Sequence, residues 1–129
     1  MSLTVSPALL DQARHGAISQ SDFLACIRES LPYAWQLIEG LAGKLQQSEA
    51  SFVDNQTPPP NEQARGQLLR VLASDSMRTA LEDHFGMKLA FQNCHRVALF
   101  RKDQFDQTYE EFISPISQLL NQSPELVDC

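Results

Sequence analysis

Long apolar runs are missing from this sequence of 129 residues. Runs such as Val97-Ala98-Leu99-Phe100 cover only a few positions, whereas a helix that crosses a bilayer needs roughly 20 consecutive apolar residues. The first residues, MSLTVSPALLDQAR, also lack the basic start and the apolar core of a secretory signal. The sequence therefore predicts neither a membrane-spanning segment nor a signal peptide.

Cysteine is scarce as well. Cys26, Cys94 and Cys129 are odd in number, lie far apart and include no CxxC pair. This usage argues against a disulfide framework and in favour of a reducing compartment. We therefore expect a cytoplasmic protein.

Catalytic and cofactor-binding motifs are also missing. GxSxG does not occur, and Gly43-Lys44 lacks both the first glycine and the following Ser or Thr of a nucleotide-binding loop. Neighbouring acids such as Glu82-Asp83 point about 100° apart on a helix, so they do not converge on a substrate. The sequence predicts no catalytic residue, no cofactor and no metal, and it favours a protein that is not an enzyme.

Glycine is limited to five residues, and β-branched runs are few, which together favour helix. A chain of this length with 43% apolar residues is long enough to bury a core of its own. We predict a single all-α domain over residues 1–129, built as a compact bundle of five to six helices.

Capping residues and prolines divide the chain into these helices. Residues 48–61 contain Pro58-Pro59-Pro60 and predict a Pro-rich loop. The last helix should begin at about Asp103, and Pro115 should kink or divide it near Ser114. The predicted helix starts are Ser6-Pro7, Ser19 or Ser21, Pro32, Pro60-Asn61, and Ser74 or Asp75, and Gly16 and Gly86 mark two of the ends.

Residues 87–101 fit two patterns. Met87, Leu89 and Phe91 alternate as in a strand, and so do Val97 and Leu99. A helical pattern collects more matches over a longer window, and no Asn-Gly or Asp-Gly turn is present. We prefer the helix; the alternative is an α+β fold with a small hairpin at about 87–101. The helical pattern consists of Met87, Ala90, Phe91, Cys94, Val97 and Ala98.

Charge is unevenly distributed along the chain. Residues 61–102 hold seven basic and four acidic side chains, whereas residues 103–129 hold six acidic and no basic ones. The net charge of the whole chain is −6, which argues against nucleic acid or an anionic membrane as the partner. A nucleic-acid-binding regulator that uses the central basic face is kept as a second alternative.

These observations favour a non-enzymatic protein–protein interaction, accessory or regulatory factor, which binds another protein or a second copy of itself. Arginine and aromatic residues dominate interface hot spots. The candidate partner-binding residues are accordingly Arg65, Arg70, His95, Arg96 and Trp35. The first alternative is a thiol- or metal-dependent sensor that uses Cys94 with His84 or His95, since nearby cations lower the pKa of a thiol. Cys94 and His95 are adjacent, however, and zinc ligands are usually spaced two to four residues apart.

Overall fold

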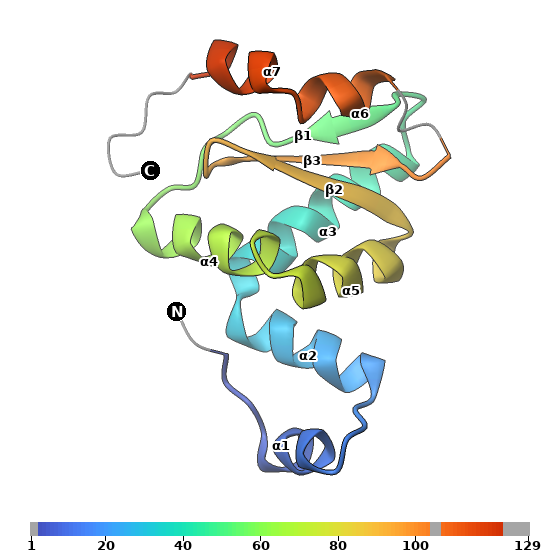
Figure 1. The fold of residues 1–129 in the computed structure, drawn as a ribbon, viewed down its shortest axis with the longest axis vertical. Coiled ribbons are helices and arrows are strands. Elements are labelled where there is room, and N and C mark those ends of the chain that lie inside the picture. The colour runs from blue at the N-terminus through green and yellow to red at the C-terminus, as the bar shows by residue number, and fades with distance from the viewer. Residues whose placement is uncertain (1–2, 104–106, 123–129) are drawn as a thin grey trace.

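The computed structural model describes residues 3–103 and 107–122. These residues form a three-stranded antiparallel sheet with helices on both of its faces (Figure 1). The helices are α1 (Pro7–Arg14), α2 (Gln20–Ser30), α3 (Pro32–Gln46), α4 (Glu62–Leu72), α5 (Asp75–Phe85), α6 (Gln107–Phe112) and α7 (Pro115–Leu120). The strands are β1 (Phe52–Asp54), β2 (Met87–Gln92) and β3 (Arg96–Arg101).

The sheet has the order β1-β3-β2, so β3 is its central strand. β2 and β3 form a hairpin whose register runs from Met87 opposite Arg101 to Gln92 opposite Arg96. β1 pairs with the other side of β3, with Phe52 opposite Phe100 and Asp54 opposite Ala98. A segment before α4 is thereby joined to the hairpin that follows α5.

The prediction of an all-α bundle is wrong. Residues 87–101 are the hairpin of the alternative interpretation, and β1 adds a strand within the predicted Pro-rich loop at 48–61. Val97 and Leu99 share one face of β3 as the strand pattern requires, but Ala98 and Phe100 on its other face are apolar and buried as well. A strand covered on both faces loses the in–out alternation by which strands are recognised.

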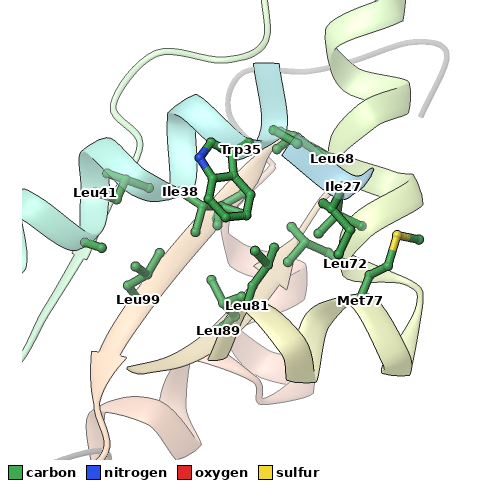
Figure 2. Packing of buried hydrophobic residues seen from close by; sticks show 14 of the residues in the cluster. Ile27, Trp35, Ile38, Leu41, Leu68, Leu72, Met77, Leu81, Leu89 and Leu99 are labelled. Atoms are coloured by element: carbon green, nitrogen blue, oxygen red, sulfur yellow. The ribbon is translucent and has the colours of Figure 1, made fainter. Parts of the chain in front are cut away.

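The two faces of the sheet contribute to two apolar clusters. Val97 and Leu99 of β3 join the main core with α2, α3, α4 and α5, where Trp35 packs beside Ile38 and Leu81 (Figure 2). Ala98 and Phe100 point the other way and pack with Phe112 of α6. The helical layers therefore differ greatly in size: four helices supply the main core, while the short α6 covers the opposite face (Figure 1).

Most helix boundaries agree with the sequence-based prediction because they depend on neighbouring residues. The side chains of Ser6, Ser19, Asn61 and Ser74 accept hydrogen bonds from backbone N–H groups in the first turns of α1, α2, α4 and α5. Gly86 ends α5 in the left-handed conformation at φ 67°. The predicted division near Ser114 separates α6 from α7, and Asp103 precedes α6 by several residues.

α3 is capped at both ends by residues distant in the sequence. Leu31, at its N-cap, makes no side-chain cap, and Gln67 of α4 instead accepts hydrogen bonds from the backbone N–H groups of Tyr33 (2.7 Å) and Ala34 (3.2 Å). Near the other end, the guanidinium of Arg101 donates to the carbonyl groups of Leu45 and Ser48. Unpaired groups at both ends of a helix are costly when buried, so these contacts fix α3 against α4 and β3.

The outer edge of β2 is blocked by a side chain. Glu82 is buried, and its carboxylate accepts a hydrogen bond from the backbone N–H of Leu89 at 2.8 Å and lies 3.5 Å from the Lys88 ammonium. An edge strand with unpaired backbone groups invites pairing with another chain. Glu82 satisfies one of these backbone groups, the N–H of Leu89.

In the described part of the chain, no helix is both long and apolar enough to cross a membrane.

Candidate interaction site

A groove lies between the sheet and the pair α6–α7. Its volume is about 750 Å³. Phe52 of β1 and Arg96 of β3 line it on the sheet side, and Phe112, Ile116 and Leu120 line it on the helix side. We call this space the α6–α7 groove. Its lining combines these apolar side chains with the guanidinium of Arg96, the carboxylates of Glu110 and Glu111 and several uncharged polar groups. Apolar walls with a few polar groups that fix orientation are usual in a binding site.

Exposed apolar side chains cluster on and just before α7, and two of them, Ile116 and Leu120, line this groove. Ile113, Ile116, Leu119 and Leu120 are between 49% and 78% exposed, and α7 contains no buried residue. Eight large hydrophobic residues are exposed in the described part of the chain, and four of them lie within residues 113–120. We call these four residues the α7 patch. Scattered exposed apolar residues are normal on a protein, but a cluster beside a groove marks an interaction surface.

Arg96 connects the groove to a polar network at the same end of the sheet. Its Nε and Nη2 atoms each lie 2.7 Å from Oδ2 of Asp54, and its Nη1 donates to Gln92 at 3.1 Å. The guanidinium carbon lies 4.8 Å from the centre of the Phe112 ring, within the range of a cation–π contact. One side chain thus holds β1, β2 and α6 together.

Asn55 and His95 extend this network behind Arg96. The amide of Asn55 accepts a hydrogen bond from the backbone N–H of Val97 at 2.8 Å and donates to the carbonyl of His95 at 2.7 Å. His95 is buried, and its Nδ1 donates to the carbonyl of Asn93 at 2.6 Å. Both residues also line a smaller polar pocket of about 250 Å³ next to Arg96. Because these groups are already bonded to one another, the network is suited to holding a shape.

The β2–β3 turn holds α6 and α7 in place. Gln92 donates from its Nε2 to the carbonyl of Phe112 and to the hydroxyl of Ser117, both at 2.8 Å. The amide of Asn93 donates to the carbonyl of Asn121 and accepts from Gln118. Two consecutive residues of the turn region therefore fix the helices that form one wall of the groove.

The turn itself has an uncommon backbone. Asn93 and Cys94 have φ values of 54° and 50°, in the left-handed region that favours glycine. Asn93 is among the residues that tolerate this region, whereas Cys94 is not. Cys94 is disulfide-bonded, while Cys26 is free and buried. The number and spacing of the cysteines give no reason to expect this bond.

The structure brings only some of the predicted site residues together. Among the candidate partner-binding residues, Arg96 lines the α6–α7 groove, and the neighbouring His95 lines the smaller polar pocket beside it. Trp35 is in the main core, with the guanidinium of Arg28 5.8 Å from its ring. Arg65 and Arg70 lie on α4, where Arg65 pairs with Glu62 and Arg70 lines a surface hollow beside Leu69.

The residues of the thiol or metal hypothesis are divided between two places. His84 lies near the end of α5, where its ring contacts Trp35, whereas Cys94 and His95 follow β2. The six residues of β2 lie between them, and at roughly 3.3 Å per residue this strand is about 20 Å long. Among the described residues, no group of three or more His, Cys, Asp or Glu side chains is arranged to hold a metal ion.

Sequence reasoning missed Asp54, Asn55 and Gln92. The partners Asp54 and Arg96 are 42 residues apart, and the predicted loop gave no reason to pair them. Asp54-Asn55 directly precedes the prolines, and such polar residues commonly bond to backbone groups in turns. That composition was the only available signal. The α7 patch was visible as apolar residues, but its exposure was not.

Comparison with known protein families finds a match over the whole chain. The model of a family described as NucS shadow ORF matches residues 1–129, which is the full length of the sequence. The chain belongs to the NucS shadow ORF family. No curated protein matches the chain, and no solved structure matches it. Membership in this family assigns no reaction or ligand, so the function is inferred from the groove, the α7 patch and the network around Arg96.

Proposed function

We propose that this protein is a non-enzymatic interaction module that binds an apolar, basic segment of another protein in the α6–α7 groove. The observation that carries the proposal is the α7 patch, four large apolar side chains exposed beside a groove. An amphipathic helix that lays its apolar face into a groove is a common mode of peptide recognition. Burial of each Leu or Ile of the patch would contribute about 1.5–3 kcal/mol.

Charge determines the kind of partner. Glu110 and Glu111 line the groove, and residues 103–129 contain six acidic side chains and no basic one. Lysine or arginine on the partner would therefore be attracted to this end of the molecule. A second copy that docked through the same surface would bring Glu110 and Glu111 of both copies together, and for this reason we favour a different protein over a homodimer.

The polar network supports a role in shape rather than in chemistry. Arg96, which sequence analysis selected as a partner-binding residue, is occupied by Asp54, Gln92 and the ring of Phe112. We assign it to positioning α6 against the sheet. The ring of His95 is likewise bonded to the carbonyl of Asn93, so we assign it to stabilising the β2–β3 turn.

Nucleic-acid binding gains little support from the central basic face. Of the seven basic residues at 61–102, five form ion pairs within the chain, and Arg101 is bonded to backbone carbonyl groups. A surface that binds phosphates needs cations that are available to them. Binding of a basic segment of a protein at the acidic side of the α6–α7 groove fits the distribution of charge better than binding of phosphates does.

The test uses a defined probe, a synthetic amphipathic helix with leucine on one face and lysine on the other. We expect it to bind the full chain, and we expect Leu119→Glu to weaken binding by about tenfold or more, since 1.4 kcal/mol corresponds to a factor of ten. Leu10→Glu is the matched control because Leu10 is an exposed leucine on α1. A peptide with glutamate in place of lysine should bind less well.

Two results would contradict the proposal. The first is equal binding by wild type, Leu119→Glu and Leu10→Glu, which would mean that the α7 patch is not the docking surface. The second is a dimer in light scattering that Leu119→Glu dissociates, which would assign the patch to a second copy of the chain. Circular dichroism of each variant controls for loss of fold.

A further inference from the structure

The polar pocket of about 250 Å³ next to Arg96 adjoins the α6–α7 groove. Arg96 and Asn121 line both spaces, while Gln56 and His95 line the polar pocket alone. The groove is mostly apolar, whereas the pocket is lined mainly by amide, imidazole and charged side chains. A segment bound in the groove therefore lies within reach of a second space with different chemistry.

One nitrogen of the His95 ring is left open to this pocket. His95 is only 5% exposed, and its Nδ1 donates a hydrogen bond to the carbonyl of Asn93 at 2.6 Å. In a neutral imidazole with its proton on Nδ1, the other nitrogen, Nε2, is an acceptor. Nε2 has no hydrogen-bond partner in the described chain, where every fully buried side-chain nitrogen and oxygen has one. Nε2 therefore retains accessible surface and presents a lone pair to the pocket that His95 lines.

The charges in the pocket favour a neutral ligand. The Asp54 carboxylate lies 2.7 Å from the Arg96 guanidinium, so the two charges offset each other. A cationic ligand would meet the guanidinium, and a carboxylate would set its own lone pairs against that of Nε2. The ligand that suits Nε2 is therefore a neutral group that donates an N–H or O–H.

The remaining polar groups of the pocket require a ligand that both donates and accepts. The Arg96 guanidinium has more N–H groups than its contacts with Asp54 and Gln92 use, and those left over can donate to a carbonyl. The amide nitrogens of Gln56 and Asn121 are bonded within the protein, but their oxygens have no partner among the described residues. A primary carboxamide carries N–H donors and a carbonyl on one planar group, and it matches this set better than a hydroxyl does.

We propose that the polar pocket binds a primary carboxamide, supplied by an asparagine or glutamine side chain of the segment that occupies the α6–α7 groove. The source of the carboxamide rests on the proposed function, whereas the chemistry of the pocket does not. A segment that covered Nε2 of His95 without donating to it would remove the water that bonds there and leave the nitrogen unsatisfied. The pocket therefore gives sequence specificity to a groove whose affinity comes mainly from apolar contacts.

Nitrogen-15 NMR of the histidine rings tests the pocket without a partner. The full chain, labelled at histidine, is titrated at a pH of about 8, where an ordinary histidine is neutral. The probes are acetamide and two charged molecules of similar size, acetate and methylammonium. We expect acetamide to move the Nε2 resonance of His95 toward that of a hydrogen-bonded nitrogen, and to leave the exposed His15 unchanged. Acetate and methylammonium should produce at most a small part of this shift.

The amphipathic leucine–lysine helix extends the test to the groove. In a set of these peptides, one glutamine is placed at each position in turn, and methionine, which has a similar length but no amide, is the reference. We expect one glutamine position to bind about fivefold more tightly than its methionine counterpart. His95→Asn keeps an amide N–H near the place of Nδ1 but has no acceptor at the place of Nε2. It should lose the preference for glutamine and bind the methionine peptide as the wild type does, and His15→Asn, the control, should keep the preference.

The proposal is overturned if acetamide leaves Nε2 of His95 unshifted, or shifts it no further than acetate or methylammonium does. A response to acetamide without a glutamine position that gains affinity would overturn the groove segment as the source of the carboxamide. Stronger binding of serine than of glutamine at the selected position would assign the pocket to a hydroxyl instead. The acetamide titration needs neither a substitution nor a peptide, so it decides the pocket even if His95→Asn fails to fold or Leu119→Glu contradicts the docking surface.

Discussion

Replacement of Arg96 by methionine should destabilise the fold far more than removal of an ordinary surface arginine. Methionine retains much of the apolar stem but removes two contacts with the Asp54 carboxylate, the hydrogen bond to Gln92 and the contact with the Phe112 ring. Asp54 is only 11% exposed, so its carboxylate would be left with little water to replace the cation. Removing one partner of a buried pair costs about 3–5 kcal/mol, and because Arg96 itself is 27% exposed, we expect about 3 kcal/mol.

Arg78 provides a matched control. Its side chain is 30% exposed, close to the 27% of Arg96, and it also pairs with an aspartate, at 2.9 Å. Asp75, however, is 90% exposed, so water replaces the lost cation. We expect Arg78→Met to cost under about 1 kcal/mol. The paired experiment therefore isolates the burial of the carboxylate from the loss of an arginine.

Urea denaturation of four proteins measures this coupling: the wild type, Arg96→Met, Asp54→Asn and the double variant. Asp54→Asn alone should cost about 1.5 kcal/mol, but in the Arg96→Met background it should restore about 1 kcal/mol, because it removes the buried charge that was left unpaired. The coupling energy is thus about 2.5 kcal/mol. Additive effects, or an Arg96→Met variant as stable as Arg78→Met, would refute the view that this pair anchors the groove.

Three further changes test contacts elsewhere in the fold. Gln67→Leu should lower the free energy of unfolding in urea by about 2 kcal/mol because two N–H groups at the start of α3 lose their acceptor. Gln63→Leu, at an exposed position of α4, the helix that also carries Gln67, is the control and should change stability by less than about 0.5 kcal/mol. Equal effects of the two substitutions would argue against the cap. Arg101→Met should lower the melting temperature by several degrees, about 4 °C per kcal/mol at this chain length, through loss of the bonds to the end of α3, and an unchanged temperature would show that they contribute nothing. Burial raises the pKa of Tyr33 above its ordinary value of 10.0, so its contribution to stability is complete below pH 10 and falls as the pH rises through the folded pKa. Tyr33→Phe should therefore lose less stability than the wild type above pH 10. If the free energy of unfolding depends on pH in the same way for both proteins, this contribution is excluded.

The sequence by itself determined most of the helices. Ser19, Asn61 and Ser74 each cap a backbone N–H three residues away, and Gly86 ends α5 through its own φ. Pro115 begins α7 immediately after its cap, Ser114. These signals act within one or two turns, and no other part of the chain needs to be known to recognise them.

The sheet and the site depended on distant parts of the chain. β1 has only three residues and exists because it pairs with β3, more than 40 positions later, and β3 is apolar on both faces because α6 covers the second face. The same distance hid the Asp54 partner of Arg96, although Arg96 and His95 were recognised as candidates. Whether Ile116 and Leu119 are core or surface was also undetermined, since an apolar helix face has the same pattern in both cases. Only the packing of α6 and α7 against the sheet decided that this face remains open beside a groove.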